Sequence, residues 1–292
     1  MNRMCPRIAA AVGCALALPW AGVAHALPMT ANFAVSGDDA GGLSIDADFS
    51  VSPTEHLTLV AGAGHSSSPV ETVELRGTLL NAGASWYGDR AGVALGYDLF
   101  DDNTNYHAGT LGARAWMRAG DFEFTLLARH RDLGVEVTLD LPLRTLRREM
   151  EFSAVGAGLQ VGFARGNFNA YAMTIGYDYD DKFDDFLDLT GSPLLDRRPR
   201  IEALLGSFLT QAQGAIDQQT GAGVEYGFGR HSLALDLSYV HDAVLDASSV
   251  SVAVSFRRAE SAHLDWSVSA GVADSEAYGD IAFLGVMLGL AN

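Results

Sequence analysis

The residues best suited to chemistry in this sequence are charged side chains that recur at every second position. The basic set occupies two neighbouring segments: Arg114, Arg118, Arg129 and Arg131. The acidic set is spread over other segments: Asp46, Asp48, Asp98, Asp178, Glu225, Asp236 and Asp265. If each segment is a β-strand, residues two apart share one face, so these charges line one side of a sheet. Facing basic and acidic walls would create a field that orients polar solutes. The alternative is that the same groups pair with one another and brace the space between them.

Histidines form a second candidate set, suited to hydrolysis. They are His65, His107, His130 and His241, with carboxylates at Asp101, Asp102 and Asp242 and a serine run at 66–68. A catalytic triad needs three groups that converge in space. We interpret these histidines as polar residues at an interface, with His65 and His241 as the two to test for catalysis.

Alternation of apolar and polar residues runs from about Met29 to the end of the chain. The segments are about ten residues long, which is the length of a membrane-spanning strand. The clearest segments are 43–51, 233–239, 250–256 and 264–272, and the less regular ones are 57–63, 93–99, 111–117, 122–128, 155–163, 171–177 and 222–228. In segment 171–177, the larger residues at 171, 173, 175 and 177 are assigned to the apolar face.

The apolar faces carry no charge, and the opposite faces hold small, polar and charged residues. A charge facing lipid at mid-bilayer costs about 2–4 kcal/mol, so this absence favours a membrane environment. A soluble β-sandwich is the alternative, but it would place its large residues inside and polar residues outside. The sequence therefore predicts an all-β fold: an antiparallel up-and-down transmembrane barrel of about fourteen strands, with twelve or sixteen as alternatives.

Connections alternate between short and long, as in a barrel with tight turns at one end and loops at the other. Short turns fall near residues 52–54, 88–90, 119–121, 165–167, 229–231 and 257–262, and longer connections at 65–73, 100–106, 132–150, 179–220 and 241–249. Aromatic residues gather beside the short turns: Trp86, Phe122, Phe163, Phe168, Phe228, Phe256 and Trp266. Tyr97, Tyr177 and Tyr239 are expected near the other interface.

The first 26 residues have the pattern of a cleaved export signal. Arg3 and Arg7 precede the apolar stretch 8–23, and Ala24-His25-Ala26 matches a small-x-small cleavage site. A lipoprotein signal at Cys14 is a weaker alternative. Both cysteines of the chain, Cys5 and Cys14, lie in this segment. The mature barrel domain, residues 27–292, would then have no disulfide, cysteine-ligated metal or thiol catalysis.

The formal net charge is −17 at pH 7, which argues against nucleic acid as a partner. No cofactor or metal site is predicted. The acidic start of the 179–220 segment has no EF-hand spacing.

In all these patterns the chain resembles bacterial outer-membrane β-barrels as a class. Its last segment resembles their C-terminal assembly signal, with Leu284, Val286, Leu288 and Leu290 alternating, although Asn292 stands where those proteins usually have Phe. Size and strand number are similar to those of monomeric fourteen-stranded porins. The resemblance implies an integral protein of a Gram-negative outer membrane. It implies contacts with membrane lipid and lipopolysaccharide, insertion by the barrel-assembly machinery, and a monomer.

The inward face is rich in glycine, which leaves space in the lumen or eases sheet curvature. The glycines are Gly62, Gly64, Gly92, Gly96, Gly112, Gly156, Gly158, Gly162, Gly223, Gly227 and Gly271. The 179–220 insert is predicted to contain an amphipathic helix that begins near Pro199. Three placements stay open for it: folded inward as a constriction, capping the mouth, or lying on the outer leaflet. In the first two, Ile201, Leu204, Leu205, Phe208 and Leu209 are the candidate gate residues. The 132–150 stretch is predicted to be a hairpin above the membrane, with Arg144, Arg147 and Arg148 at its tip.

The function predicted from these features is a porin-like channel for passive diffusion of small polar solutes, without enzymatic activity. Two alternatives stay open. One is an outer-membrane lipid or peptide hydrolase with its active site at the rim, although known sequence patterns of such enzymes are absent. The other is a non-conducting structural or adhesion barrel.

Overall fold

Fourteen β-strands make up the part of the chain that the structure describes. The structure is a computed structural model, which describes residues 27–70, 73–102, 106–141, 144–180, 215–243, 246–276 and 279–292. The strands are β1 (Met29–Asp38), β2 (Leu43–Thr54), β3 (Leu57–Val70), β4 (Val73–Tyr87), β5 (Ala91–Asp101), β6 (Tyr106–Ala119), β7 (Phe122–Leu141), β8 (Arg144–Arg165), β9 (Phe168–Tyr179), β10 (Ile216–Phe228), β11 (His231–Asp242), β12 (Ala247–Ala259), β13 (Leu264–Ser275) and β14 (Gly279–Ala291).

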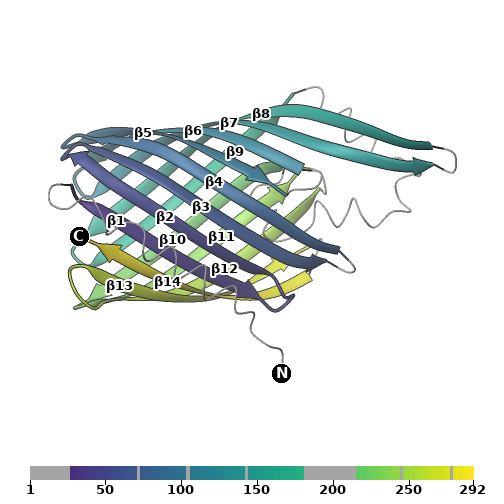
Figure 1. The fold of residues 1–292 in the computed structure, drawn as a ribbon. Helices are drawn as coiled ribbons and strands as arrows, with labels where there is room; N and C mark the ends of the chain where they lie inside the picture. Colours follow the sequence, from purple (N-terminus) through teal and green to yellow (C-terminus); the bar gives the residue numbers. More distant parts are fainter. Residues whose placement is uncertain are drawn as a thin grey trace.

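These strands close into one antiparallel barrel (Figure 1). Each strand pairs with the next one along the chain, and β14 pairs with β1 through matches such as Val35 with Val286. Closure satisfies the backbone hydrogen bonds of every strand within the wall, which a membrane-spanning sheet requires. The predicted fold and strand number are therefore confirmed. No helix of the described ranges is long and apolar enough to cross a membrane.

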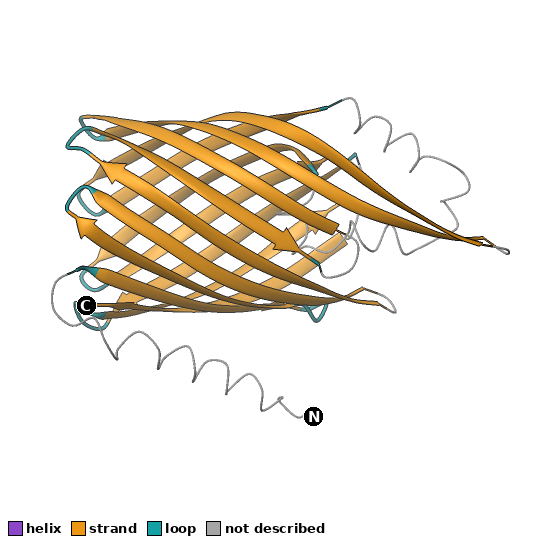
Figure 2. Ribbon diagram, turned by 45° about the horizontal axis from the view of Figure 1, so that its top comes forward, coloured by secondary structure: helices purple, strands orange, loops and turns teal. Residues whose placement is uncertain are grey.

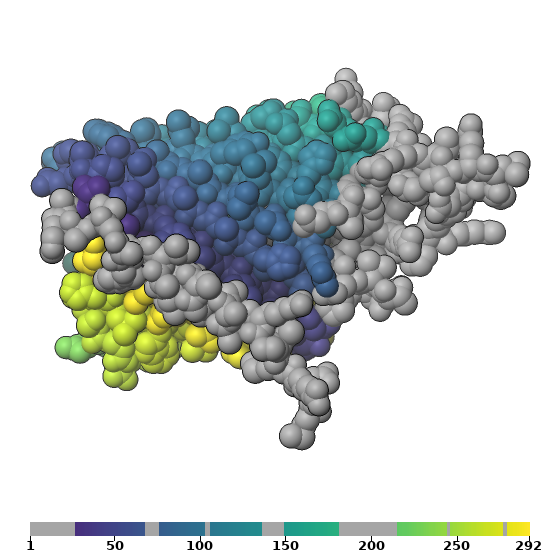
Figure 3. Space-filling view, in the orientation of Figure 1, coloured from purple at the N-terminus to yellow at the C-terminus, as the bar shows by residue number. Residues whose placement is uncertain are grey.

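The outer face of the wall is apolar and exposed. Large side chains such as Leu95, Leu126 and Val155 are more than 60% exposed on this face. Exposed leucine, valine and aromatic side chains occur there on strands all round the barrel. In the space-filling view the wall formed by the early strands is a continuous surface (Figure 3). Such an apolar band is stable against the lipid chains of a bilayer, whereas its exposure to water would be unfavourable.

Tight turns mark the end of the barrel at which the C-terminus lies (Figure 2), and an aromatic belt lies beside them. Gly120, Gly166 and Gly229 open two-residue turns with positive φ angles, as hairpins with glycine in the first turn position require. Beside these turns the predicted aromatic residues are in contact. Ring centroids are 5.2 Å apart for Phe122 and Phe163, and 5.7 Å apart for Phe256 and Trp266. This end is the periplasmic one, because short turns face the periplasm in such barrels.

The opposite, extracellular end differs from the prediction in two connections. Segment 65–73 is not a loop, because β3 and β4 remain paired as far as Val70 and Val73. The 179–220 insert is shorter than predicted, because Tyr179 still belongs to β9 and β10 already begins at Ile216. The predicted helix and its gate residues at 201–209 lie outside the described residues.

The predicted hairpin above the membrane is confirmed. β7 and β8 pair from Phe122–Phe163 to Leu141–Arg144, and their extracellular halves project well beyond the rest of the wall (Figure 1). Strands of 20 and 22 residues are about twice as long as a membrane crossing needs. The arginines at 144, 147 and 148 are part of the projecting β8.

Candidate functional site: a charged lumen

Ten of the eleven predicted lumen charges lie on the inner face. Directly paired residues of neighbouring strands share a face. The inner face therefore follows from pairs such as Asp48 with Gly62, Asn81 with Asp98, and Glu225 with Ala234. The prediction for Asp178 is wrong. Asp178 pairs with Val155, which is 61% exposed on the outer face, so this carboxylate points away from the lumen.

The error applies to all of β9: the face predicted to contact lipid faces the lumen, and the face predicted to line the lumen faces lipid. Tyr171, Ile175 and Tyr177 pair with Gly162, Gly158 and Gly156 of β8, and all of them face inward. A side chain added at Gly156 would collide with the Tyr177 ring, and one at Gly158 with Ile175. The glycines of β8 thus make room for large residues of β9. Tyr177 therefore does not belong to the outer aromatic belt, whereas Tyr97 and Tyr239 face outward.

Most of the acidic residues lie flat on the wall and are hydrogen-bonded there. Asn81 Nδ2 donates to Asp48 Oδ1 at 3.1 Å, Ser44 Oγ donates to Asp46 Oδ2 at 2.7 Å, and the Tyr171 hydroxyl donates to Asp236 Oδ1 at 2.8 Å. Arg257 Nη2 donates to Asp265 Oδ2 at 2.8 Å, and Asn169 Nδ2 donates to Glu225 Oε2 at 3.4 Å. These contacts favour the bracing interpretation for these five acids. Arg257, which the sequence analysis did not single out, is the inward arginine of β12.

The arginines of β6 and β7 form a row that runs from the periplasmic end toward the extracellular end. Arg118 is 62% exposed at its side chain and forms an ion pair with Glu123 at 2.7 Å. Arg114 lies over the Trp116 ring, 5.6 Å from its centroid. Arg129 Nη1 donates to the Tyr177 hydroxyl at 3.0 Å. Arg131 is only 2% exposed, and its guanidinium group lies over the Tyr177 ring, 5.5 Å from the ring centroid. Solvent access therefore falls steadily along the row.

Buried side chains gather on the inner face toward the extracellular end. One buried cluster combines Phe100, Tyr106, Ala108, Leu133, Met150, Phe152 and Ala215. A second combines Ala154, Ile175, Tyr177 and Ile216. The Tyr179 hydroxyl donates to the backbone oxygen of Ile216 at 2.8 Å, which ties β9 to β10 at this level. Inward residues of the other half, such as Ala273 and Ile281, are also buried. Among the described inner-face residues, the arginines toward the periplasmic end are exposed, whereas the apolar clusters toward the extracellular end are buried.

The predicted rim histidines do not converge. His65 lies on β3 and His241 on β11, on different sides of the barrel. His241 is flanked by Asp217 and Asp246, with each nitrogen–oxygen distance at 3.5 Å. His130 lies 3.3 Å from Asp132.

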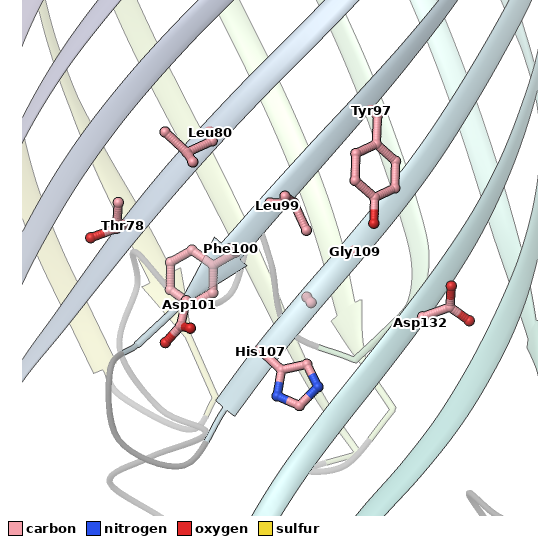
Figure 4. A pocket seen from close by; sticks show the side chains of 10 residues that line it. Thr78, Leu80, Tyr97, Leu99, Phe100, Asp101, His107, Gly109 and Asp132 are labelled. Carbon is pink, nitrogen blue, oxygen red and sulfur yellow. The ribbon is translucent and has the colours of Figure 1, made fainter.

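His107 lies in a groove of about 430 Å³ on the outer face near the extracellular rim (Figure 4). Leu80, Leu99 and Tyr97 form its apolar part, and the Tyr97 hydroxyl lies over Gly109. Asp132 lies at the side of His107, and the groove opens to the bilayer rather than to the lumen.

Comparison with known proteins supports the fold. No protein-family model matches the chain, and the search of curated proteins gives no match. Among solved structures, it is similar to a loop-deletion variant of OmpT, an outer membrane protein of Vibrio cholerae, at 9% identity and a TM-score of 0.52, covering 91% of this chain and 98% of that one. OmpT of Vibrio cholerae expressed in the outer membrane gives 8% identity and a TM-score of 0.50, covering 91% and 97%.

A further similar structure is the CymD monoaromatic hydrocarbon channel, at 8% identity and a TM-score of 0.50, covering 92% of this chain and 89% of that one. At such low sequence identities, the similarity supports the fold but does not indicate the activity. The closed barrel, its exposed apolar outer face and these neighbours agree. The chain has the fold of the bacterial outer-membrane β-barrels and is an integral protein of that membrane.

Proposed function

We propose that this barrel is a channel for the diffusion of small polar solutes across the outer membrane. The observation that carries the proposal is that charged side chains of the lumen are exposed to solvent toward the periplasmic end. Arg114 and Arg118 are exposed inside the lumen, among many small and polar residues of its walls. A barrel that served only as a scaffold needs no hydrated charges in an internal space, whereas in a channel such charges act on the solutes that pass.

In the proposed channel, the buried side chains toward the extracellular end are the constriction, and this structure is a closed state. Passage requires the buried side chains near Phe100, Tyr106 and Phe152 to move apart. The predicted gate at residues 201–209 remains a second element of the proposal. A barrel wall is rigid because its hydrogen bonds are complete, so opening is expected to involve side chains and connections rather than strands.

Single-channel recording tests the proposal. The refolded chain should produce discrete current steps in a planar bilayer, and replacing Phe100 and Phe152 together by Ala should raise the open fraction because it removes packing from the closed end. Replacing Phe122 and Phe163, which lie on the outer aromatic belt, is the matched control and should leave the open fraction unchanged. Correctly folded protein that never conducts, including the Phe100 and Phe152 variant, would refute the channel.

The hydrolase alternative gains little from the described residues. Near His107, the closest serine in an adjoining depression is Ser153, whose hydroxyl donates to Asp180 at 3.1 Å. Within the described ranges, no serine hydroxyl is hydrogen-bonded to a histidine ring. A nucleophile with its base, which acyl hydrolysis needs, is therefore not assembled there.

A further inference from the structure

A cavity of about 340 Å³ lies on the inner wall between β3 and β7. Its inward-facing lining combines Val60, Leu127, Asn81, Asp98, Arg114 and Arg129. It lies on the periplasmic side of the buried clusters, because its residue Arg129 contacts Tyr177, a member of the second cluster. Solutes that enter the lumen from the periplasmic end therefore reach it.

The charges around this cavity are engaged by the wall without ion pairing: Arg129 contacts the Tyr177 hydroxyl and interacts electrostatically with Asp98, and Arg114 lies over the Trp116 ring. Of the six predicted acids that face inward, five accept the hydrogen bonds described above, whereas Asp98 accepts none from any described residue. Of the four arginines of β6 and β7, Arg118 is paired with Glu123 and Arg131 is buried. Across the described ranges, Arg114 and Arg129 take part in no ion pair, and Asp98, Arg114 and Arg129 all line the one cavity.

The backbone also leaves space at this place. Gly96 and Gly112 are paired across β5 and β6, and an added Cβ on either would lie at least 3.7 Å from any other atom. At Gly62, Gly64 and Gly223, by contrast, a neighbouring side chain already fills the position of a Cβ. The floor of the cavity is thus bare backbone, open to a ligand.

The register places opposite charges at the two ends of this floor. Gly112 pairs with Arg129, and Arg114 is two residues further along β6 on the same face. Both guanidinium groups therefore border Gly112, where they suit a carboxylate, which arginine binds with paired hydrogen bonds. Asp98 is two residues beyond Gly96 on β5 and pairs with Asn81. Along the strands, Asp98 is about 7 Å from the level of Gly112 and Arg129 and about 13 Å from that of Arg114, so the ligand must be short.

We infer that this cavity binds small carboxylates that carry an amino or hydroxyl group. Arg114 and Arg129 hold the carboxylate, Asp98 and Asn81 accept or donate hydrogen bonds at the other end, and Val60 and Leu127 contact the carbon chain. The inference deepens the proposed channel, on which it rests, by naming the class of solute that it favours. Fixed charges of both signs would discriminate against neutral and purely apolar solutes.

Equilibrium binding to the refolded full chain in detergent micelles tests the site without any need for current. The probes are L-serine, propionate and propanamide, and binding is measured by saturation-transfer NMR titration. Serine should bind most tightly, propionate more weakly, and propanamide not measurably. Arg129→Gln should weaken serine and propionate binding by about tenfold or more, since charge-assisted hydrogen bonds are lost.

Two variants separate the ends of the site. Asp98→Asn should weaken serine binding but leave propionate binding unchanged, because propionate has no amino group. Gly112→Leu should block both probes by filling the floor while every charge is retained. The controls are Arg118→Gln, whose arginine is already paired, and Gly227→Leu, whose inward glycine has comparable open space outside the cavity. Folding of each variant is checked by the shift in gel mobility on heating.

The outcomes keep the two proposals apart. Serine binding that survives Arg129→Gln together with Gly112→Leu would overturn the site, as would absence of binding to a chain that conducts current. In the latter case the channel stands without this solute class. Binding with the expected variant pattern, in a barrel that never conducts, would support the site and refute the channel.

Discussion

Tyr177 connects the open and closed parts of the lumen. Its hydroxyl accepts a hydrogen bond from Arg129, and its ring lies beneath Arg131 while it packs with Ile175 and Ile216. Tyr177→Phe should keep the ring and lose only the hydrogen bond, so the free energy of unfolding should fall by about 1–3 kcal/mol. Urea titration followed by tryptophan fluorescence measures this. Tyr226→Phe, at an exposed outward position, is the control, and an equal effect of both changes would contradict the role of the hydrogen bond.

Glycine positions that look alike in sequence differ in what surrounds them. Gly223 has the Asp236 carboxylate and the Tyr171 ring where a Cβ would be, whereas nothing lies within 4 Å of that position at Gly176. Gly223→Ala should therefore disturb the Tyr171–Asp236 hydrogen bond and lower stability by about 1–3 kcal/mol. Gly176→Ala should be neutral or stabilising by less than about 1 kcal/mol, because alanine restricts the unfolded chain. Equal stability changes in the same urea titration would show that the two sites are equivalent.

At the scale of the element, β9 offers the sharpest test of orientation. The structure places Ala172 toward lipid and Met173 toward the lumen, near the middle of the strand. Ala172→Lys should lower the free energy of unfolding in lipid vesicles by about 2–4 kcal/mol, because a lysine at mid-bilayer is costly, while Met173→Lys should cost much less. The sequence prediction for β9 requires the opposite order, so the two variants discriminate between them.

The sequence was sufficient to predict the orientation of strands that have one charge-free apolar face and one polar face. Leu235 and Val254, for example, alternate with Asp236 and Ser255, and only one orientation keeps charge out of lipid. β9 lacks that contrast, since Ala170, Ala172 and Thr174 are also acceptable to lipid. Its orientation is imposed by the register with β8, where glycines leave room inward. The sequence shows glycines at 156, 158 and 162, which predict free space on the inner face. It does not show that large residues of the next strand, β9, fill this space.

The candidate site was predictable in kind rather than in detail. Alternation alone placed Asp98, Arg114 and Arg129 on the inner face. Which charges are engaged depends on partners in neighbouring strands, such as Asn81 for Asp48 and Tyr171 for Asp236. Those pairings follow from the register, which a single sequence specifies only where both faces are distinct.

At the scale of the whole molecule, the lumen has one wet end and one packed end. Single cysteines can measure this difference, because residues 27–292 contain no cysteine. Ser232→Cys, near the periplasmic turns, should react rapidly with a charged thiol reagent in the folded barrel. Ala154→Cys and Ala273→Cys should react far more slowly, since both positions are only 1% exposed. Similar rates at all three positions would mean that the extracellular end is open as well.

The two ends of the described barrel are hydrogen-bonded to each other. The Met29 backbone N–H donates to Asn292 Oδ1 at 2.7 Å, and Asn292 Nδ2 donates to the Leu27 oxygen at 3.3 Å. With β1 and β14 also paired, no strand is first or last in a physical sense, and the chain is nearly a ring. Circular permutation is the consequence: a short linker across this seam, with new ends placed in an extracellular connection, would preserve every strand pair. The order in which strands are synthesised could then be changed without changing the wall that they form.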